Sequence, residues 1–89
     1  MKHNNKKLIA QAQQNIKNKA LYESYIQKSL NNIHACVLEG KNKHLIYVYE
    51  NKKVAKMIAK ELRRRGYMAY IYTERNYYEN KKYKITVKW

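Results

Sequence analysis

The chain of 89 residues contains no proline and only two glycines, so very few positions force a turn or end a helix. Its secondary structure must therefore be inferred mainly from the spacing of apolar residues. Residues 4–32 contain neither glycine nor proline and are rich in lysine, glutamine, alanine and leucine, which favour helices. We expect a long N-terminal helix that ends near Asn31 and Asn32.

The expected helix carries two apolar stripes that do not align. The first stripe is Ile9, Ala12, Ile16 and Ala20, and the second is Tyr22, Tyr25, Ile26, Ser29 and Leu30. Either the helix kinks near residues 18–20 or its two halves contact different surfaces. The N-terminal half has few large apolar residues, which is typical of an arm that orders on binding or on oligomerising. We predict a basic helical arm over residues 1–20 and an α+β domain over residues 21–89.

The segment after this helix has the alternation of a β-hairpin. In residues 33–38 the apolar Ile33, Ala35 and Val37 alternate with other side chains, and residues 45–49 are β-branched or aromatic. Residues 39–43, which include a glycine, predict the turn between them. We therefore expect two paired strands in this region.

The next segment predicts a second helix over residues 52–65. Val54, Ile58 and Leu62 repeat at helical spacing. Asn51 before them is a favourable N-cap, and Gly66 after them is a favourable C-cap.

Two further strands are expected at residues 67–73 and 83–89, joined by a polar loop over residues 74–81. The last strand alternates between an apolar row that begins at Tyr83 and a basic row that begins at Lys82, as in a sheet with one buried and one solvated side. The predicted order is α-β-β-α-β-β, a single small α+β domain with its helices on one face of a four-stranded, mostly antiparallel sheet.

The charge of the chain is strongly unbalanced. Twenty lysines and arginines face six acidic residues, all of them glutamate, and the formal net charge is +14. Codon bias in an AT-rich genome can explain many of the ten tyrosines, but it does not explain the missing acids. Such an imbalance costs stability through self-repulsion until a polyanion or an acidic partner neutralises it.

Two basic surfaces are candidates for binding a polyanion. The helix over residues 52–65 carries its cations opposite the apolar stripe, and the last strand carries a basic row next to strands rich in tyrosine. The predicted nucleic-acid-binding residues are Lys52, Lys53, Lys56, Lys60, Arg63 and Arg64 on the helix, and Lys82, Lys84, Lys88, Tyr70 and Tyr72 on the sheet. Lysines neutralise phosphates and tyrosine rings stack on bases. Each surface also has a plain structural explanation, a solvated helix face and tyrosines that pack a core.

Catalytic and metal chemistry find little support. The glutamates are scattered, with no aspartate to pair with them in acid–base work. The only soft metal ligands are His3, His34, His44 and Cys36, without the CxxC or HxxxH spacing of zinc sites. There is no glycine-rich phosphate loop, no apolar run long enough for a membrane span and no apolar core of a signal peptide. We expect a cytoplasmic protein that is not an enzyme and needs no cofactor or metal.

The second half of the chain follows a pattern of strand, helix and strands: residues 45–49, then Asn51, Val54, Ala55, Ala59 and Leu62, then Gly66, Tyr67, Ala69 and Ile71, then residues 83–87. In this pattern residues 45–89 resemble half of a SPOR domain, a family that binds the glycan strands of peptidoglycan. The short, Lys/Asn/Tyr-rich style of the chain is similar to that of small proteins encoded by phages of AT-rich Gram-positive hosts. That resemblance implies binding to host machinery or to nucleic acid.

Two functions follow as hypotheses. The first is a non-enzymatic nucleic-acid-binding protein of low sequence specificity that combines basic surfaces with tyrosine stacking on DNA or RNA. The second is a phage-type inhibitor whose cationic surface blocks an acidic or nucleic-acid-binding site on a host replication, transcription or defence protein.

Overall fold

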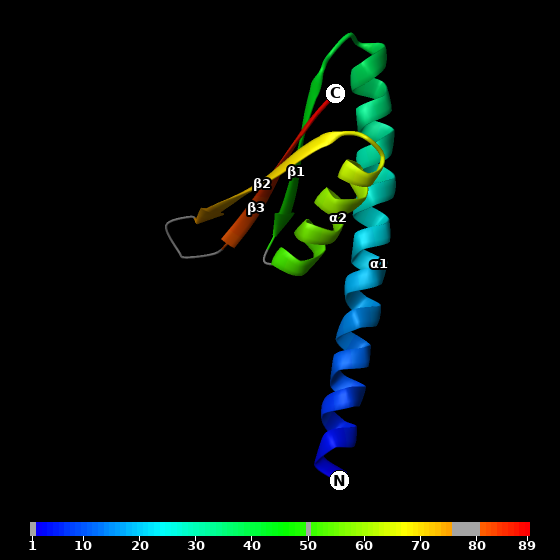
Figure 1. The fold of residues 1–89 in the computed structure, drawn as a ribbon, viewed down its shortest axis with the longest axis vertical. Coiled ribbons are helices and arrows are strands. Elements are labelled where there is room, and N and C mark those ends of the chain that lie inside the picture. The colour runs from blue at the N-terminus through cyan, green and yellow to red at the C-terminus, as the bar shows by residue number, and fades with distance from the viewer. Residues whose placement is uncertain (1, 50, 76–80) are drawn as a thin grey trace.

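The computed structural model of the protein describes residues 2–49, 51–75 and 81–89. The elements are α1 (Lys2–Leu38), β1 (Lys43–Tyr49), α2 (Lys52–Arg64), β2 (Met68–Arg75) and β3 (Lys81–Lys88). The strands form one antiparallel sheet in the order β1-β3-β2, with β3 in the centre. Helix α2 packs on one face of this sheet, and α1 lies against α2 and β1 (Figure 1).

The α+β class is confirmed, but the predicted four-stranded sheet and the order α-β-β-α-β-β are wrong. The described sheet has three strands and the order is α-β-α-β-β, because residues 33–38 are the last turns of α1 and not a strand. Helical spacing from Ile26 through Leu30 places Ile33 in the core, where it is 1% exposed. Val37, which an alternating strand would bury with it, is 47% exposed. The apolar stripe of the helix therefore continues past Asn31 and Asn32, and a short alternating run was mistaken for a strand.

The two glycines of the chain end the two helices of the described residues. Gly40 and Gly66 have φ angles of 79° and 98°, which side chains with a Cβ rarely adopt. At the end of α1, the Lys41 N–H donates to Cys36 O at 2.9 Å and the Gly40 N–H donates to Val37 O at 3.0 Å. The same pair of bonds closes α2 at Gly66, where the Tyr67 N–H donates to Leu62 O at 3.0 Å. Both ends are Schellman motifs. The prediction for Gly66 is confirmed, and Gly40 proves to be a helix terminator instead of a hairpin glycine.

The core lies between α2 and the inner face of the sheet. Its fully buried side chains include Val54, Ile58 and Leu62 of α2 and Ile85 and Val87 of β3. Val48 and Ile46 of β1 and Ala69 of β2 complete it from the two edge strands. Because the apolar stripe of α2 faces the sheet, the opposite side of α2 faces away from the sheet.

Helix α1 continues well beyond this core. It runs as one helix through residues 18–20, and its N-terminal end projects past the sheet and α2 (Figure 1). Ile9 and Ile16 of the first predicted stripe are 58% and 69% exposed, whereas Tyr22, Ile26 and Leu30 of the second stripe pack on the core. The second alternative therefore holds: α1 continues as one helix, the first stripe is exposed, and the second stripe packs on the core. The division of the chain at residue 20 stays a prediction.

A polar contact joins the two helices where α2 begins. The predicted N-cap is confirmed, because Asn51 Oδ1 accepts a hydrogen bond from the Val54 N–H at 3.0 Å. The Asn51 Nδ2 amide donates to Asn18 Oδ1 at 3.1 Å, and Gln14 Nε2 donates to the same oxygen at 3.1 Å. Asn18 is 5% exposed, so its amide is one of the few buried polar groups of α1. No helix in the described ranges has the length and apolar character to cross a bilayer.

Candidate nucleic-acid interface

The face of the sheet opposite α2 is not covered by a helix. We call it the open sheet face, and its side chains are Lys43, Leu45, Tyr47 and Tyr49 of β1, Lys82, Lys84, Thr86 and Lys88 of β3, and Met68, Tyr70, Tyr72 and Glu74 of β2. The four tyrosines are between 37% exposed, at Tyr47, and 63% exposed, at Tyr49. Exposed rings in this number are unusual for a small domain, because aromatic side chains gain most from burial.

The strand order sets lysines between two columns of tyrosines. Lys84 of the central strand pairs with Tyr47 on one side and with Tyr72 on the other. Thr86 pairs with Tyr70, and Lys82 pairs with Tyr49. Neighbouring strands are about 4.8 Å apart, so Lys84 lies within reach of a ring on each edge strand. Lys82 has a paired ring only on the β1 side, and Lys88 pairs with Lys43 and Met68.

Two lysines rest on these rings. Lys82 Nζ lies 4.7 Å from the centroid of the Tyr47 ring, and Lys84 Nζ lies 5.7 Å from that of Tyr72. Cation–π contacts at exposed sites contribute about 0.5–1 kcal/mol, whereas base stacking on an aromatic ring contributes about 1–3 kcal/mol. A base can therefore displace the ammonium group from the ring, and the lysine is then free to meet a phosphate.

One carboxylate restrains the same lysines. Glu74 Oε1 lies 3.1 Å from Lys84 Nζ, and Glu74 Oε2 lies 3.5 Å from Lys82 Nζ. The hydrogen bond from Lys84 holds the pKa of the Glu74 carboxyl below its usual value, and the nearby charges of both lysines act in the same direction. The carboxylate is thus charged at neutral pH and occupies two ammonium groups that a phosphate would need.

The six predicted residues of α2 lie on its other side and are all exposed. Three of them have partners within the protein. Arg63 Nε donates to Ala69 O at 2.8 Å, Lys53 Nζ donates to Asn15 Oδ1 at 3.4 Å, and Arg64 Nη2 donates to Glu61 Oε2 at 2.8 Å.

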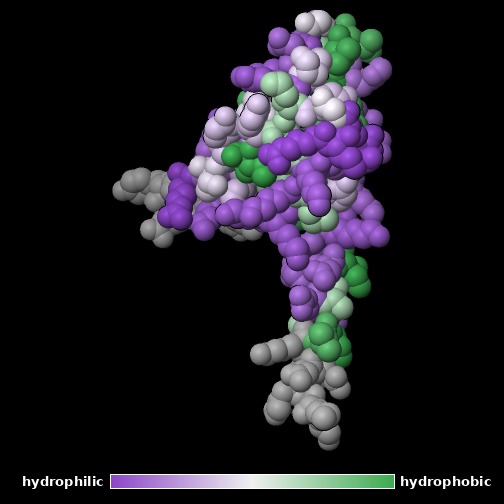
Figure 2. All heavy atoms as spheres, in the orientation of Figure 1, coloured by the Kyte–Doolittle hydropathy of each residue, from purple (hydrophilic) through white to green (hydrophobic). Residues whose placement is uncertain are grey.

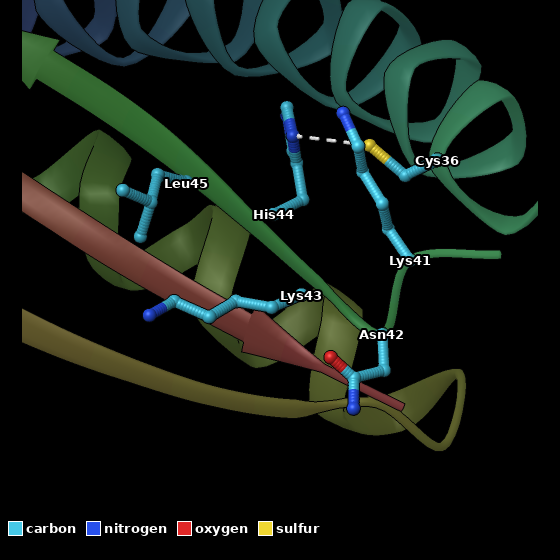
Figure 3. A pocket seen from close by; sticks show the side chains of 6 residues that line it. All are labelled: Cys36, Lys41, Asn42, Lys43, His44 and Leu45. Atoms are coloured by element: carbon cyan, nitrogen blue, oxygen red, sulfur yellow. Dashed lines mark hydrogen bonds between the residues drawn. The ribbon is translucent and has the colours of Figure 1, made fainter. Parts of the chain in front are cut away.

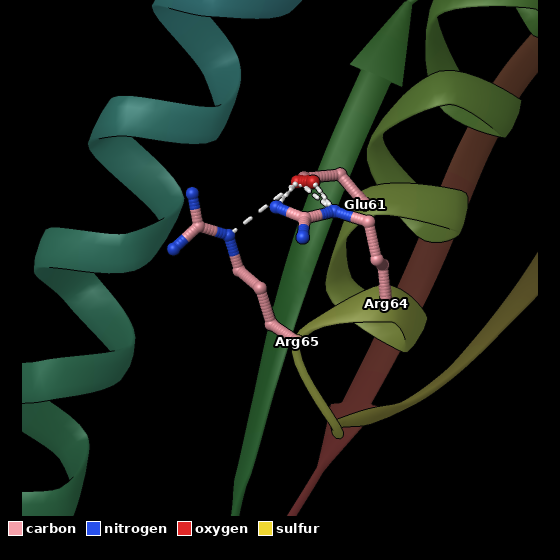
Figure 4. Close-up of polar contacts among 3 residues, drawn as sticks. All are labelled: Glu61, Arg64 and Arg65. Atoms are coloured by element: carbon pink, nitrogen blue, oxygen red, sulfur yellow. Dashed lines mark hydrogen bonds and ion pairs between the residues drawn. The ribbon is translucent and has the colours of Figure 1, made fainter.

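Glu61 also draws Arg65, whose Nε lies 3.6 Å from Glu61 Oε2 (Figure 4). The hydrogen bond from Arg64 is the main cause that lowers the pKa of Glu61; burial opposes it, and the charges of both arginines lower the pKa further. Tyr22 of α1 lies beside this cluster, where burial first and the Glu61 carboxylate second raise its pKa. Glu61 is therefore engaged with arginines at the end of α2.

The predicted site residues therefore divide into two groups. Lys82, Lys84, Lys88, Tyr70 and Tyr72 share the open sheet face, whereas the α2 residues belong to the helix on the other face of the sheet, where Arg63 bonds to β2 and Lys53 bonds to α1. Figure 2 shows hydrophilic side chains in a broad band over the region of α2. No single short ligand can contact both groups.

Several residues of the open sheet face were missing from the predicted site. Tyr47 and Tyr49 of β1 also belong to this face, whereas the sequence predicted only Tyr70 and Tyr72. Their alternation with buried Ile46 and Val48 was the available signal. Glu74 lay in a predicted loop, and the structure instead places it in β2 opposite Lys82.

A second polar cluster lies where α1 meets β1. Cys36 Sγ is 3.8 Å from His44 Nδ1, and Lys41 extends into the same shallow hollow of about 510 Å³ (Figure 3). Burial, followed by the charge of Lys41, lowers the pKa of His44. His34 is exposed on α1, away from the contact between Cys36 and His44. Among the described residues, no three His, Cys, Asp or Glu side chains form a group that could hold a metal ion.

Comparison with known protein families, curated proteins and solved structures finds no match for this chain. The resemblance to half of a SPOR domain and the phage-like style therefore stay predictions. The function must be argued from the surfaces themselves.

Proposed function

We propose that the protein binds single-stranded nucleic acid, DNA or RNA, on its open sheet face with low sequence specificity. The observation that carries this proposal is the cross-strand row Tyr47–Lys84–Tyr72, in which an exposed ring stands on each side of a central lysine. A strand that follows β3 would place phosphates on Lys82, Lys84 and Lys88 and bases on the tyrosines of either edge. Unpaired bases offer a π-face to such rings, and paired bases in a duplex do not.

Low specificity is expected from the chemistry of this face. Its four lysines attract phosphate without reading a base edge. Among its described residues, the open sheet face carries no arginine, asparagine or glutamine, the side chains best suited to bidentate contacts with bases.

The test is a titration of the purified protein with labelled single-stranded DNA, single-stranded RNA and duplex DNA of one length, across a salt series. We expect the single strands to bind more tightly than the duplex to the sheet face and the affinity to fall steeply with salt. No binding of any of the three at about 50 mM salt, where phosphate contacts are strongest, would contradict the proposal.

A second candidate function is binding to an acidic host protein, as a phage-type inhibitor would do. One end of the open sheet face favours it, because Leu45 and Met68 are exposed there beside Lys43 and Lys88. Apolar and aromatic side chains with a cationic rim are common in protein interfaces. Capture from nuclease-treated host lysate separates the two: one stoichiometric protein partner that survives nuclease supports the inhibitor, and loss of all bound material supports the nucleic-acid binder.

A further inference from the structure

The outward side of α2 presents a row of three lysines, which we call the α2 lysine row: Lys52, Lys56 and Lys60. The three are spaced four residues apart, so they stand above one another on one face of the helix and span about 12 Å along its axis. All three are exposed, and Val54, Ile58 and Leu62 on the other side of α2 are fully buried against the sheet.

No acidic side chain offsets this row within the part of the chain that the structure describes. The ion pairs found there join Glu39 to Lys41, Glu61 to Arg64 and Arg65, and Glu74 to Lys82 and Lys84. Like charges at i, i+4 on a helix each cost about 0.2–0.5 kcal/mol. The row thus lowers the stability of α2, and a bound polyanion would remove this repulsion.

The chemistry of the row differs from that of the open sheet face. Helix α2 contains no aromatic residue, so the row offers ammonium groups and no stacking surface. Such a row can neutralise backbone phosphates without distinguishing paired from unpaired bases. Its ligand class is therefore any phosphate backbone, and a duplex, with its higher density of charge, is the stronger ligand.

We propose that the α2 lysine row is a second nucleic-acid site, so that one molecule bridges two separate segments of nucleic acid. Val54, Ile58 and Leu62 of α2 face the sheet, and the row lies on the other side of the helix. The row therefore points away from the sheet, and the open sheet face lies on the far side of the sheet. A strand on the sheet face leaves the row free for the backbone of another segment. This bridging activity rests on the proposed single-strand binding by the sheet face.

The experiment immobilises a single-stranded oligonucleotide on beads, adds the full-length protein and then adds a labelled duplex that is not complementary to it. Retention of the protein reports on the sheet face, and retention of the duplex reports on bridging. For the wild type we expect both. For the variant K52Q/K56Q/K60Q we expect the protein to be retained and the duplex signal to fall about tenfold or more, since three phosphate contacts are lost.

A matched control separates the loss of the α2 lysine row from a general loss of positive charge. The variant K17Q/K19Q removes two charges from α1 and should recruit the duplex nearly as well as the wild type, whereas K56Q/K60Q, which removes two charges from the α2 lysine row, should not. Glutamine has almost the helix propensity of lysine, so both variants should fold, which a thermal melt checks.

Four outcomes overturn the bridging proposal while leaving single-strand binding intact. In the first three, the protein is retained without the duplex, K17Q/K19Q and K56Q/K60Q lose the duplex equally, or labelled polyglutamate is recruited in place of the duplex, which assigns the row to an acidic protein. Persistent bridging by K52Q/K56Q/K60Q also overturns it, since two sheet faces of an oligomer would then hold both segments. Failure of the protein itself to bind the beads instead contradicts the proposed function of the sheet face.

Discussion

The open sheet face and the α2 lysine row are both basic, yet they are built differently. On the sheet face, Lys82 and Lys84 rest on tyrosine rings and share the carboxylate of Glu74. On α2, Lys52, Lys56 and Lys60 have no such partners among the described residues. The first surface combines charge with flat apolar area, and the second offers charge alone.

The presence or absence of tyrosine rings determines which ligands each surface can recognise. Charge attracts every phosphate backbone, and only the rings can distinguish an unpaired base from a paired one. The sheet face should therefore select single strands, whereas the α2 row should not select at all.

The largest effect is expected from removing the rings beside Lys84. In Y47A/Y72A, each lost stacking contact costs about 1–3 kcal/mol, so single-strand affinity should fall at least about tenfold. Duplex affinity should change little, and fluorescence anisotropy with labelled oligonucleotides measures both. The control Y47F/Y72F keeps the rings and should bind as the wild type does. Equal losses for single strand and duplex in Y47A/Y72A would contradict the contrast between the surfaces.

The next effect is on the salt dependence of binding. Lys84→Gln should reduce the slope of log K against log salt by about 0.7 for a single strand, and Lys56→Gln should reduce the slope for a duplex by about 0.9. Lys84→Gln should change the single-strand slope more than the duplex slope, and Lys56→Gln should do the reverse. Titrations at four or five salt concentrations measure the slopes. If each substitution changed both slopes equally, the two surfaces would not be separate sites.

A smaller effect, of opposite sign, is expected at Glu74. Glu74→Gln releases Lys82 and Lys84, so single-strand affinity should rise by a few fold, in the range of exposed ion pairs at about 0–1 kcal/mol. Because the lysines lower the pKa of the Glu74 carboxyl, the advantage of the variant should persist at neutral pH. The affinity advantage of the variant should vanish only below the ordinary carboxyl pKa of 4.5, as the pH falls through the lowered pKa of Glu74. There the wild-type carboxylate takes up a proton and no longer holds the lysines.

The stability of the fold should follow the same titration. A carboxyl group whose pKa is lowered in the folded state stabilises that state above its ordinary value, and the contribution is lost as the pH falls through the lowered pKa. Glu74→Gln should therefore weaken the acid sensitivity of the melting temperature. If the variant bound no better than the wild type at neutral pH, Glu74 would not restrain the lysines.

The smallest effect on binding is expected at the start of α2. Asn51→Ala removes the N-cap and should lower the free energy of unfolding by about 1 kcal/mol. The rate of amide hydrogen exchange should rise in the first turn of α2, which begins at Lys52, while single-strand affinity stays unchanged. Asn51→Asp keeps the capping oxygen but loses the amide that donates to Asn18, so it separates the cap from the contact between the helices. A fall in single-strand affinity in Asn51→Ala would mean that the two surfaces are coupled.

Local signals predicted part of this structure well. Asn51, the Val54/Ile58/Leu62 stripe and Gly66 define α2 from the sequence, because caps and apolar spacing act within a few residues. The alternation of β3 likewise placed Lys82, Lys84 and Lys88 on one side and Tyr83, Ile85 and Val87 on the other. The strand predicted at residues 33–38 was wrong, because a short alternating run is compatible with both a strand and a helix end. The packing of Ile33 in the core decides between them.

The sequence by itself therefore determined which side of α2 and of β3 is basic, since side-chain direction follows from the local backbone geometry. Only the tertiary structure decided what surrounds those lysines. The order β1-β3-β2 brings Tyr47 and Tyr72, 25 positions apart in the chain, to either side of Lys84 and sets Glu74 against the same lysine. Strand order depends on contacts between distant segments, and no local pattern encodes such contacts.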